Sequence, residues 1–191
     1  MKILGTGSSL PQKIVSNDDL AQVMDTSDEW ISSRTGIKMR HIAVEETTTS
    51  MSVDAAKKAL CDASVDAEDI DLIIAATVSP DYIFPTLACE VQAALGAVHA
   101  TAFDIGAGCS GFLFALATAD AYFASGRFQK ALIIGAETLS KMMDWSDRST
   151  CVLLGDGAGA AVVSAVGTQL LSMVQGSDGA GGMAVKCDNR P

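Results

Sequence analysis

The sequence contains no run of about 20 apolar residues, so no segment predicts a membrane-spanning helix. Its start, MKILGTGSSLP, has an apolar stretch too short for a secretory signal peptide and continues directly into turn residues. Basic residues are also few, since 13 Lys and Arg stand against 23 Asp and Glu, for a net charge of −10. A general nucleic-acid-binding surface needs clustered Lys and Arg, which this balance does not favour. We therefore expect a cytoplasmic protein that binds neither a membrane nor nucleic acid.

The five cysteines follow no spacing that predicts a disulfide framework or a metal site. There is no CxxC motif and no Cys/His cluster, which argues against zinc, and we expect no metal. An odd number of cysteines without framework spacing favours free thiols in a reducing cytosol. Apolar residues nevertheless make up 49% of the 191 residues, enough for a well-packed domain core.

Patterns of strands and helices alternate along the chain. Short apolar runs at 71–79 and 130–138 are typical of strands buried on both faces. Further strands are expected at 2–11, 37–44, 99–108, 157–166 and 168–176, and helices at 16–24, 26–36, 49–65, 86–96 and 109–126. The helix at 109–126 is apolar almost all round, which predicts a buried helix. This alternation predicts an α/β fold with a mostly parallel sheet.

Several helix ends carry recognisable capping residues. Ser16 or Asn17 is expected to cap the first helix, and Ser27 the second, because a side-chain oxygen there can accept from a free backbone N–H. Gly36 and Gly96 are expected to end two helices.

Cys109 stands in FDIGAGCSGFLFAL, between a predicted strand and the predicted buried helix. The free N–H groups and the dipole at a helix N-terminus favour a thiolate, which is the nucleophilic form of cysteine. Small neighbours at 106–108 leave room for a substrate carbonyl, and Gly111 lets another backbone approach closely. The Cys109 N–H could also help to hold an oxyanion. The alternative is a buried structural cysteine.

Four segments, TSDEWISSRTGI, AFDIGAGCSGF, GAETLSKMMDWSDRST and LLGDGAGAAV, occur in an order that resembles the N-terminal half of β-ketoacyl-acyl carrier protein synthase III. That family lies in the thiolase-like superfamily, and the resemblance runs from residue 3 to about residue 166. It implies a thiolase-like α/β fold, one half of an αβαβα arrangement, with a mixed five-stranded sheet and a buried central helix. It also implies a half-domain at 1–166 that carries the nucleophile, and the truncated start of a C-terminal half at 167–191.

The resemblance implies that Cys109 takes an acetyl group from acetyl-CoA, or another short acyl group, and passes it to malonyl-acyl carrier protein with decarboxylation. This step initiates fatty acid synthesis, uses acetyl-CoA as substrate without a cofactor, and occurs in a homodimer. The sequence ends before the family's triad histidine and asparagine, so the missing half is expected in a second chain or a longer protein. Alternatives are a related acyl-CoA condensing enzyme of secondary metabolism, or a non-catalytic CoA-binding or dimerisation half.

The resemblance also implies a site for CoA. Trp30 matches a tryptophan that stacks on the adenine, and Arg148 an arginine on the other face of that ring. Arg34 matches a residue near the CoA phosphates and Thr26 one near the adenine. The alternative for Trp30 is core packing, although the preceding Asp28 and Glu29 favour a surface helix; for Arg34 and Thr26 it is a solvated face with a capping threonine.

Three residues match positions of the acyl pocket. Leu139 and Leu154 line it in the resemblance, and many relatives carry phenylalanine at the second position, so leucine could admit a different starter group. The alternative is that both belong to the core. Phe84 matches a residue that reaches across the dimer interface into the neighbouring pocket.

Overall fold

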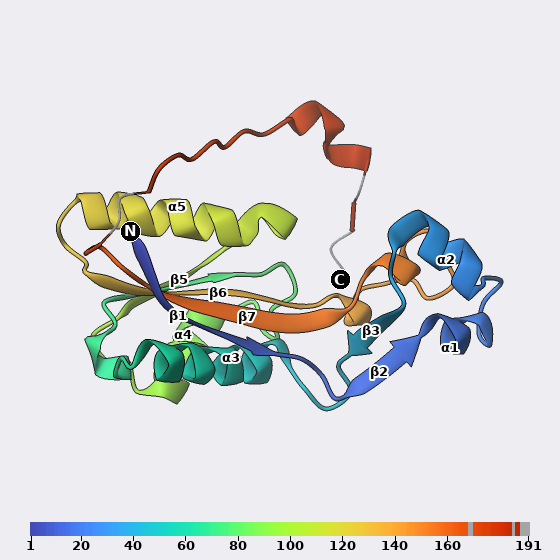
Figure 1. The fold of residues 1–191 in the computed structure, drawn as a ribbon, viewed down its shortest axis with the longest axis horizontal. Coiled ribbons are helices and arrows are strands. Elements are labelled where there is room, and N and C mark those ends of the chain that lie inside the picture. Colours follow the sequence, from blue (N-terminus) through green and yellow to red (C-terminus); the bar gives the residue numbers. More distant parts are fainter. Residues whose placement is uncertain (168–169, 185, 188–191) are drawn as a thin grey trace.

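The computed structural model describes residues 1–167, 170–184 and 186–187, and it is built around a mixed sheet (Figure 1). Five strands lie in the order β1-β7-β6-β4-β5. The strands β4, β5 and β6 are parallel, whereas β7 is antiparallel to both β6 and β1. This is the predicted mixed five-stranded sheet. Its members are β1 (Lys2–Ser9), β4 (Leu72–Ala76), β5 (Thr101–Ile105), β6 (Lys130–Thr138) and β7 (Asp156–Ser164).

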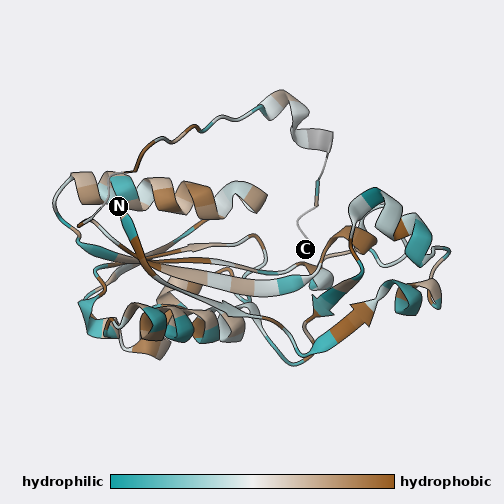
Figure 2. Ribbon diagram, viewed as in Figure 1, coloured by the Kyte–Doolittle hydropathy of each residue, from teal (hydrophilic) through white to brown (hydrophobic). Residues whose placement is uncertain are grey.

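Two helices cover one face of the sheet, namely α3 (Thr48–Ala63) and α4 (Leu87–Leu95). Thr47 caps α3 in a reciprocal capping box with Ser50, and Gly96 ends α4 in the left-handed conformation that favours glycine. Alternate residues of β4 and β6 point into this layer, where they pack against the alanine-rich inner face of α3. Figure 2 shows the matching alternation of hydrophobic and hydrophilic residues along α3.

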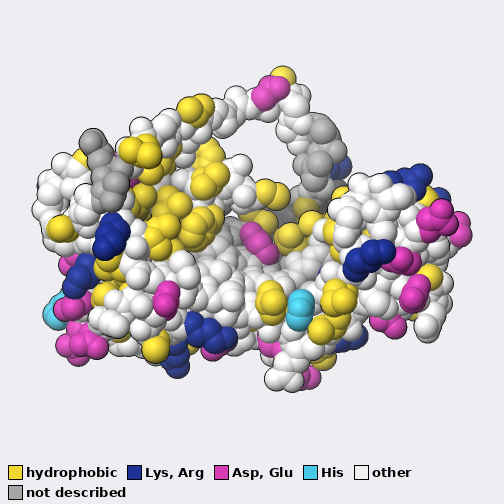
Figure 3. Space-filling view, viewed as in Figure 1, with side chains coloured by type: hydrophobic (Ala, Val, Ile, Leu, Met, Phe, Trp, Pro, Cys, Tyr) yellow, Lys and Arg dark blue, Asp and Glu magenta, His cyan; other side chains and the backbone are white. Residues whose placement is uncertain are grey.

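The opposite face is covered by α5 (Gly111–Ala124), so the described fold has three layers, helix, sheet and helix. Ala115, Ala119 and Phe123 are buried against the sheet, as predicted. The outward side differs from the prediction of a helix buried all round, because Leu113 there is 65% exposed. Figure 3 shows hydrophobic side chains gathered over this part of the molecule.

A smaller lobe stands beside the sheet (Figure 1). The antiparallel strands β2 (Lys13–Ser16) and β3 (Met39–Ile42) enclose α1 (Asn17–Ala21) and α2 (Asp28–Thr35) in the sequence. Of the two candidate caps for α1, Ser16 is the N-cap and Asn17 is the first helical residue. Ser27 caps α2 and Gly36 ends it, as predicted. A small core joins this lobe to a 3-10 turn at Cys151–Leu153.

The strand predicted at 168–176 is wrong for residues 170–176, which form no strand, while 168 and 169 lie outside the described residues. The tail leaves the sheet after β7 and passes over α5, where it meets no free sheet edge (Figure 1). Gln175 lines the same cavity as Phe114 and Tyr122 of α5. The domain boundary at residue 166 remains a prediction. Within the described part of the chain, no helix has the length and apolar character needed to cross a bilayer.

Candidate active site

Cys109 lies at the carboxyl edge of the parallel strands. β5 ends at Ile105, and Cys109 follows in a 3-10 turn over Gly108–Ser110, where it is exposed. Gly108 has a φ of 53°, a left-handed conformation that side chains rarely adopt. The helix itself begins at Gly111, two residues later than predicted, because the tighter turn precedes it.

The start of α5 lies directly against the end of β4. A Cβ atom added at Gly111 would come within 2.9 Å of the Ala76 Cβ, so a larger residue would push the helix away from the sheet. The ends of two parallel strands and the first turn of a helix therefore meet around Cys109. In α/β proteins, ligands bind at this edge of the sheet.

Glu137, near the end of β6, occupies the same edge, although the residue pattern did not single it out. Its carboxylate accepts hydrogen bonds from the Val78 N–H at 2.9 Å, from the Thr77 hydroxyl at 3.3 Å, and from the Ser79 hydroxyl. These bonds attach the loop that follows β4 to the carboxyl end of β6. The sequence feature that could have indicated Glu137 is a carboxylate at the end of a buried apolar run, since a carboxylate placed there needs hydrogen-bond partners.

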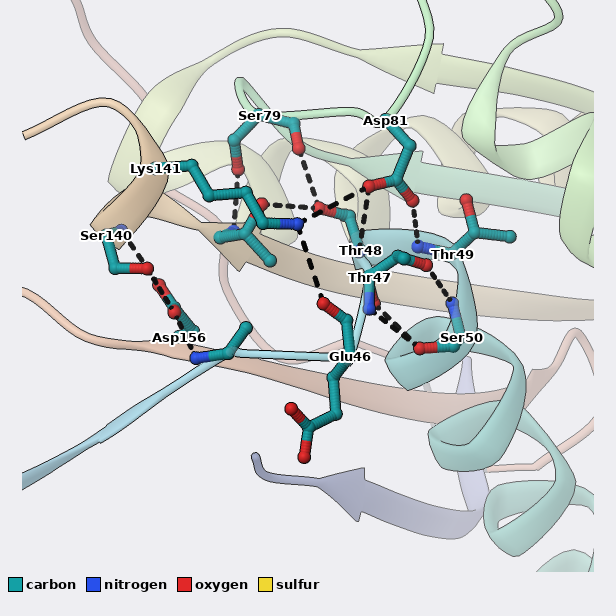
Figure 4. A network of polar contacts seen from close by, with 12 residues as sticks. Glu46, Thr47, Thr48, Thr49, Ser50, Ser79, Asp81, Ser140, Lys141 and Asp156 are labelled. Carbon is teal, nitrogen blue, oxygen red and sulfur yellow. Dashed lines mark hydrogen bonds and ion pairs between the residues drawn. The ribbon is translucent and has the colours of Figure 1, made fainter. Parts of the chain in front are cut away.

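The other end of this loop is attached to α3 (Figure 4). The Asp81 carboxylate accepts from the Thr48 and Thr49 N–H groups at 3.2 and 2.7 Å, where the helix N-terminus is positive. Burial raises the pKa of Asp81, but hydrogen bonds, led by that of Thr49, lower it below its ordinary value. The Thr48 hydroxyl donates to the Ser79 carbonyl at 2.7 Å. The first part of the loop that carries Phe84, residues 77–81, is thus fixed both to β6 and to α3.

A second cluster surrounds Trp30 on α2. The guanidinium carbon of Arg34 lies 4.6 Å from the Trp30 ring centroid, and that of Arg148 lies 4.9 Å from it. Arg148 is held by the carbonyl of Asp25 and, at 3.3 Å, by its carboxylate. Thr26 lies beside this cluster in sequence, and its hydroxyl oxygen is buried with no hydrogen-bond partner among the described residues. The structure thus brings together Trp30, Arg34 and Arg148.

The family 3-oxoacyl-[acyl-carrier-protein (ACP)] synthase III matches residues 103–187, which include the Cys109 turn and α5. A relative from Caldanaerobacter subterraneus subsp. tengcongensis, named beta-ketoacyl-[acyl-carrier-protein] synthase III, is 56% identical over 94% of this chain and 55% of its own length. The chain belongs to the synthase III family. This confirms the resemblance drawn from the sequence.

Solved structures agree with this assignment of the fold. The 3-oxoacyl-[acyl-carrier-protein] synthase III of Aquifex aeolicus VF5 superposes with a TM-score of 0.84 at 56% identity, over 85% of this chain and 53% of that one. The priming beta-ketosynthase of the R1128 polyketide biosynthetic pathway gives 0.83 at 40% identity, over 85% and 49%. The chain spans about half the length of the synthase III relatives that it matches.

The three residues that the synthase III resemblance placed at an acyl pocket are not among those that line the cavity beside them. That cavity, of about 780 Å³, lies between the loop after β4 and the segment after β6. Leu139 and Leu154 are half-buried just beyond β6 and just before β7, and Phe84 is 83% exposed. None of the three lines the cavity, so their role stays a prediction.

Asp28 makes the α2 region of this synthase III chain sensitive to acid. Hydrogen bonds from Asn17, then Ser32 and Lys38, lower its pKa to about 2. Because the pKa of Asp28 is lower in the folded chain than in the unfolded chain, where it is ~3.9, the ionised carboxylate stabilises the fold above that pH. This stabilisation is lost as the pH falls through about 2.

We expect Asp28→Asn to flatten the acid side of the stability curve between those two values, measured by urea unfolding from pH 5 to pH 2. Lys38→Met removes one of the three donors and should remove only part of the effect. An Asp28→Asn chain with the same acid dependence as the native chain would contradict this assignment.

Proposed function

We propose that this chain is the nucleophile-carrying part of a β-ketoacyl-acyl carrier protein synthase III, with Cys109 as the acyl acceptor. The observation that carries the proposal is an exposed cysteine in the turn between β5 and α5, in a chain of this family. The thiolate attacks the thioester carbonyl of acetyl-CoA, the carbon–sulfur bond to CoA breaks, and CoA leaves as a thiolate that takes a proton from solvent. The acyl group then resides on Cys109, which divides one difficult transfer into two steps.

In the complete enzyme, malonyl-acyl carrier protein then loses carbon dioxide and its α-carbon attacks the acyl-Cys109 thioester. The carbon–carbon bond forms and the Cys109 thiolate leaves, which returns the enzyme to its starting state. The reaction needs no cofactor beyond its substrates. The acyl-pocket roles of Leu139, Leu154 and Phe84 belong to this proposal, as does the half-domain at 1–166.

The Trp30 cluster is proposed to hold the CoA adenine. A flat indole and a planar guanidinium offer two stacking surfaces, and Arg34 and Arg148 add positive charge for phosphates. The Thr26 hydroxyl, which has no hydrogen-bond partner in the described part of the chain, supports the assignment, because a ligand that bonds to a buried polar atom removes the cost of leaving it unsatisfied. In the structure Arg148 lies over Trp30 itself, so a ring entering between them would displace its guanidinium.

A homodimer is part of the same proposal. β5 is an edge strand of the described sheet, and its backbone can pair with a second chain. The adjoining loop after β4 exposes Tyr82, Ile83 and Phe84, which suits an interface more than open solvent.

Two other functions remain as alternatives. The likeness to a priming ketosynthase of a polyketide pathway favours a condensing enzyme with another acyl starter. A non-catalytic module would bind CoA through the Trp30 cluster without using Cys109.

One experiment separates these functions. The chain is incubated with radiolabelled acetyl-CoA, and the position of acid-stable label is found by peptide mapping, with Cys109→Ala as the control. Label on Cys109 supports the synthase, and a stronger signal with a longer acyl-CoA supports the other starter. CoA binding without label supports the module, and neither label nor binding rejects the proposal.

Trp30→Ala is expected to weaken CoA binding by roughly 1–2 kcal/mol, the scale of one lost stacking partner. Isothermal titration with CoA measures the change. Trp145→Phe is the matched control, because Trp145 is the other tryptophan and its indole N–H donates to the Ser140 carbonyl, away from Trp30. An unchanged dissociation constant for Trp30→Ala would remove Trp30 from the site.

A further inference from the structure

A buried polar pair, Asn17 and Arg40, joins the two segments that carry Trp30 and Arg148. Asn17 is 1% exposed and Arg40 is 6% exposed. The Arg40 guanidinium donates through Nη2 to the Asn17 side-chain oxygen at 2.7 Å. A charged group this far from water requires well-placed partners, so the contacts of this pair constrain the segments around it.

The Asn17 side chain holds α2 at both ends. Its Nδ2 donates to the Asp28 carboxylate at 2.8 Å, where α2 begins. The same nitrogen donates to the Ile37 carbonyl at 2.7 Å, just after Gly36 ends the helix. The helix between these anchors carries Trp30, so Asn17 fixes the position of the indole from the side facing the core.

Arg40 holds the other segment. Its Nη2 also donates to the Val152 carbonyl at 3.3 Å, in the 3-10 turn that follows Arg148 and precedes Leu154. The polypeptide then runs close against β3: a Cβ added at Gly155 would come within 3.2 Å of the Arg40 Cβ. One continuous chain of hydrogen bonds therefore runs from α2 through Asn17 and Arg40 to the segment 148–155.

We propose that Asn17 and Arg40 are positioning residues that set the spacing between Trp30 and Arg148, and with it the affinity for an adenine ring. The inference rests on the proposed function, since it concerns the same CoA site. Neither residue touches the ring. Each residue acts by holding one of the two side chains that contact the adenine ring. Losing the hydrogen bonds of either residue therefore lets the Trp30 and Arg148 stacking surfaces separate.

Two variants each remove one part of this hydrogen-bond network, either at Asn17 or at Arg40. Asn17→Asp keeps an acceptor for Arg40 but removes the bonds that Nδ2 donates to Asp28, Ser32 and Ile37, and it places a carboxylate beside Asp28. Arg40→Lys keeps the positive charge but removes the guanidinium, whose Nη2 donates to Asn17 and Val152 while its Nη1 donates to Val15. Gln22→Glu, an exposed position at the end of α1, is the control for added negative charge. Circular dichroism verifies that each variant is folded.

Binding is measured for CoA and for 4′-phosphopantetheine, which lacks the adenine. We expect each variant to bind CoA about 10-fold more weakly and 4′-phosphopantetheine within about twofold of the native chain. The double variant should lose little more than either single one, because both cut the same chain of contacts. Equal loss for both ligands, or native affinity for CoA, would overturn the inference.

A second readout needs no ligand. In a Trp145→Phe background, Trp30 is the remaining tryptophan, and Arg148 covers its ring. Acrylamide should quench its fluorescence more strongly in Asn17→Asp and Arg40→Lys than in Gln22→Glu. Equal quenching in all three rejects the positioning role. A native chain that fails to bind CoA rejects the proposed function instead, and the quenching result still decides the role of the pair.

Discussion

Cys109→Ser is expected to lower acyl labelling from acetyl-CoA on the order of 10³-fold or more, while CoA binding stays within about twofold of the native value. A serine hydroxyl is far from ionised at neutral pH, whereas cysteine is by its chemistry the far stronger nucleophile. Binding should persist because the Trp30 cluster is held by α2, Asp25 and Arg148. Intact-protein mass and titration with CoA measure the two quantities on the same preparation.

Cys61→Ser is the matched control, since Cys61 is also an exposed free thiol but lies on α3. It should label and bind as the native chain does. Label that survives in Cys109→Ser would identify another nucleophile, and joint loss of labelling and CoA binding would show that the substitution disturbs the fold.

Local features of the fold followed from the sequence because they depend on near neighbours. Ser27 and Gly36 mark the ends of α2 through contacts within one helical turn. The apolar run at 71–79 forms β4, a strand buried at every position. The exposure of the outward side of α5 was not predictable from the sequence. Apolar composition indicates that a helix face is to be covered, but it does not show whether the covering residues belong to the same chain.

Contacts between distant segments could not be predicted from the pattern of apolar and charged residues along the sequence. Glu137 bonds to residues on the loop after β4, and Arg40 bonds to Val152, which lies 112 residues further along the sequence. Pattern shows that Arg40 is charged, and charged side chains are ordinarily exposed, so its burial was unexpected. A register of pairing, here Ala76 opposite Gly135, is needed before Glu137 can be placed at the edge that carries Cys109.

The candidate site likewise combines contacts between near neighbours, which the sequence predicts, with contacts between distant segments, which it does not. Trp30 and Arg34 stand four residues apart on α2, a spacing that brings their side chains together on any helix. Arg148 was expected near them through family resemblance alone, because nothing local connects it to α2. Thr26 was weighed as a capping residue, but Ser27 is the cap, and the Thr26 hydroxyl has no partner among the described residues.

Gly7→Ala is expected to destabilise the chain by about 3 kcal/mol, because the added methyl group would overlap atoms of α3. β1 crosses α3 so closely that a Cβ at Gly7 would lie 2.2 Å from the Ala55 carbonyl oxygen and 2.5 Å from the Ala59 nitrogen. These are backbone atoms of one helix, so no side-chain rotation relieves the overlap and α3 must move as a unit. Moving it disrupts the core that α3 and α4 share with β4 and β6.

Gly159→Ala on β7 separates this overlap from the general effect of replacing a strand glycine. A Cβ there meets no atom within 4 Å, and the residue pairs with Ser8, next to Gly7 on β1. Reduced freedom of the unfolded chain should leave this variant neutral or stabilise it by about 0.4–1 kcal/mol. Urea unfolding of both variants gives the comparison. Equal stability of the two would mean that β1 and α3 are less tightly packed than the structure has them, because only their close approach distinguishes the two sites.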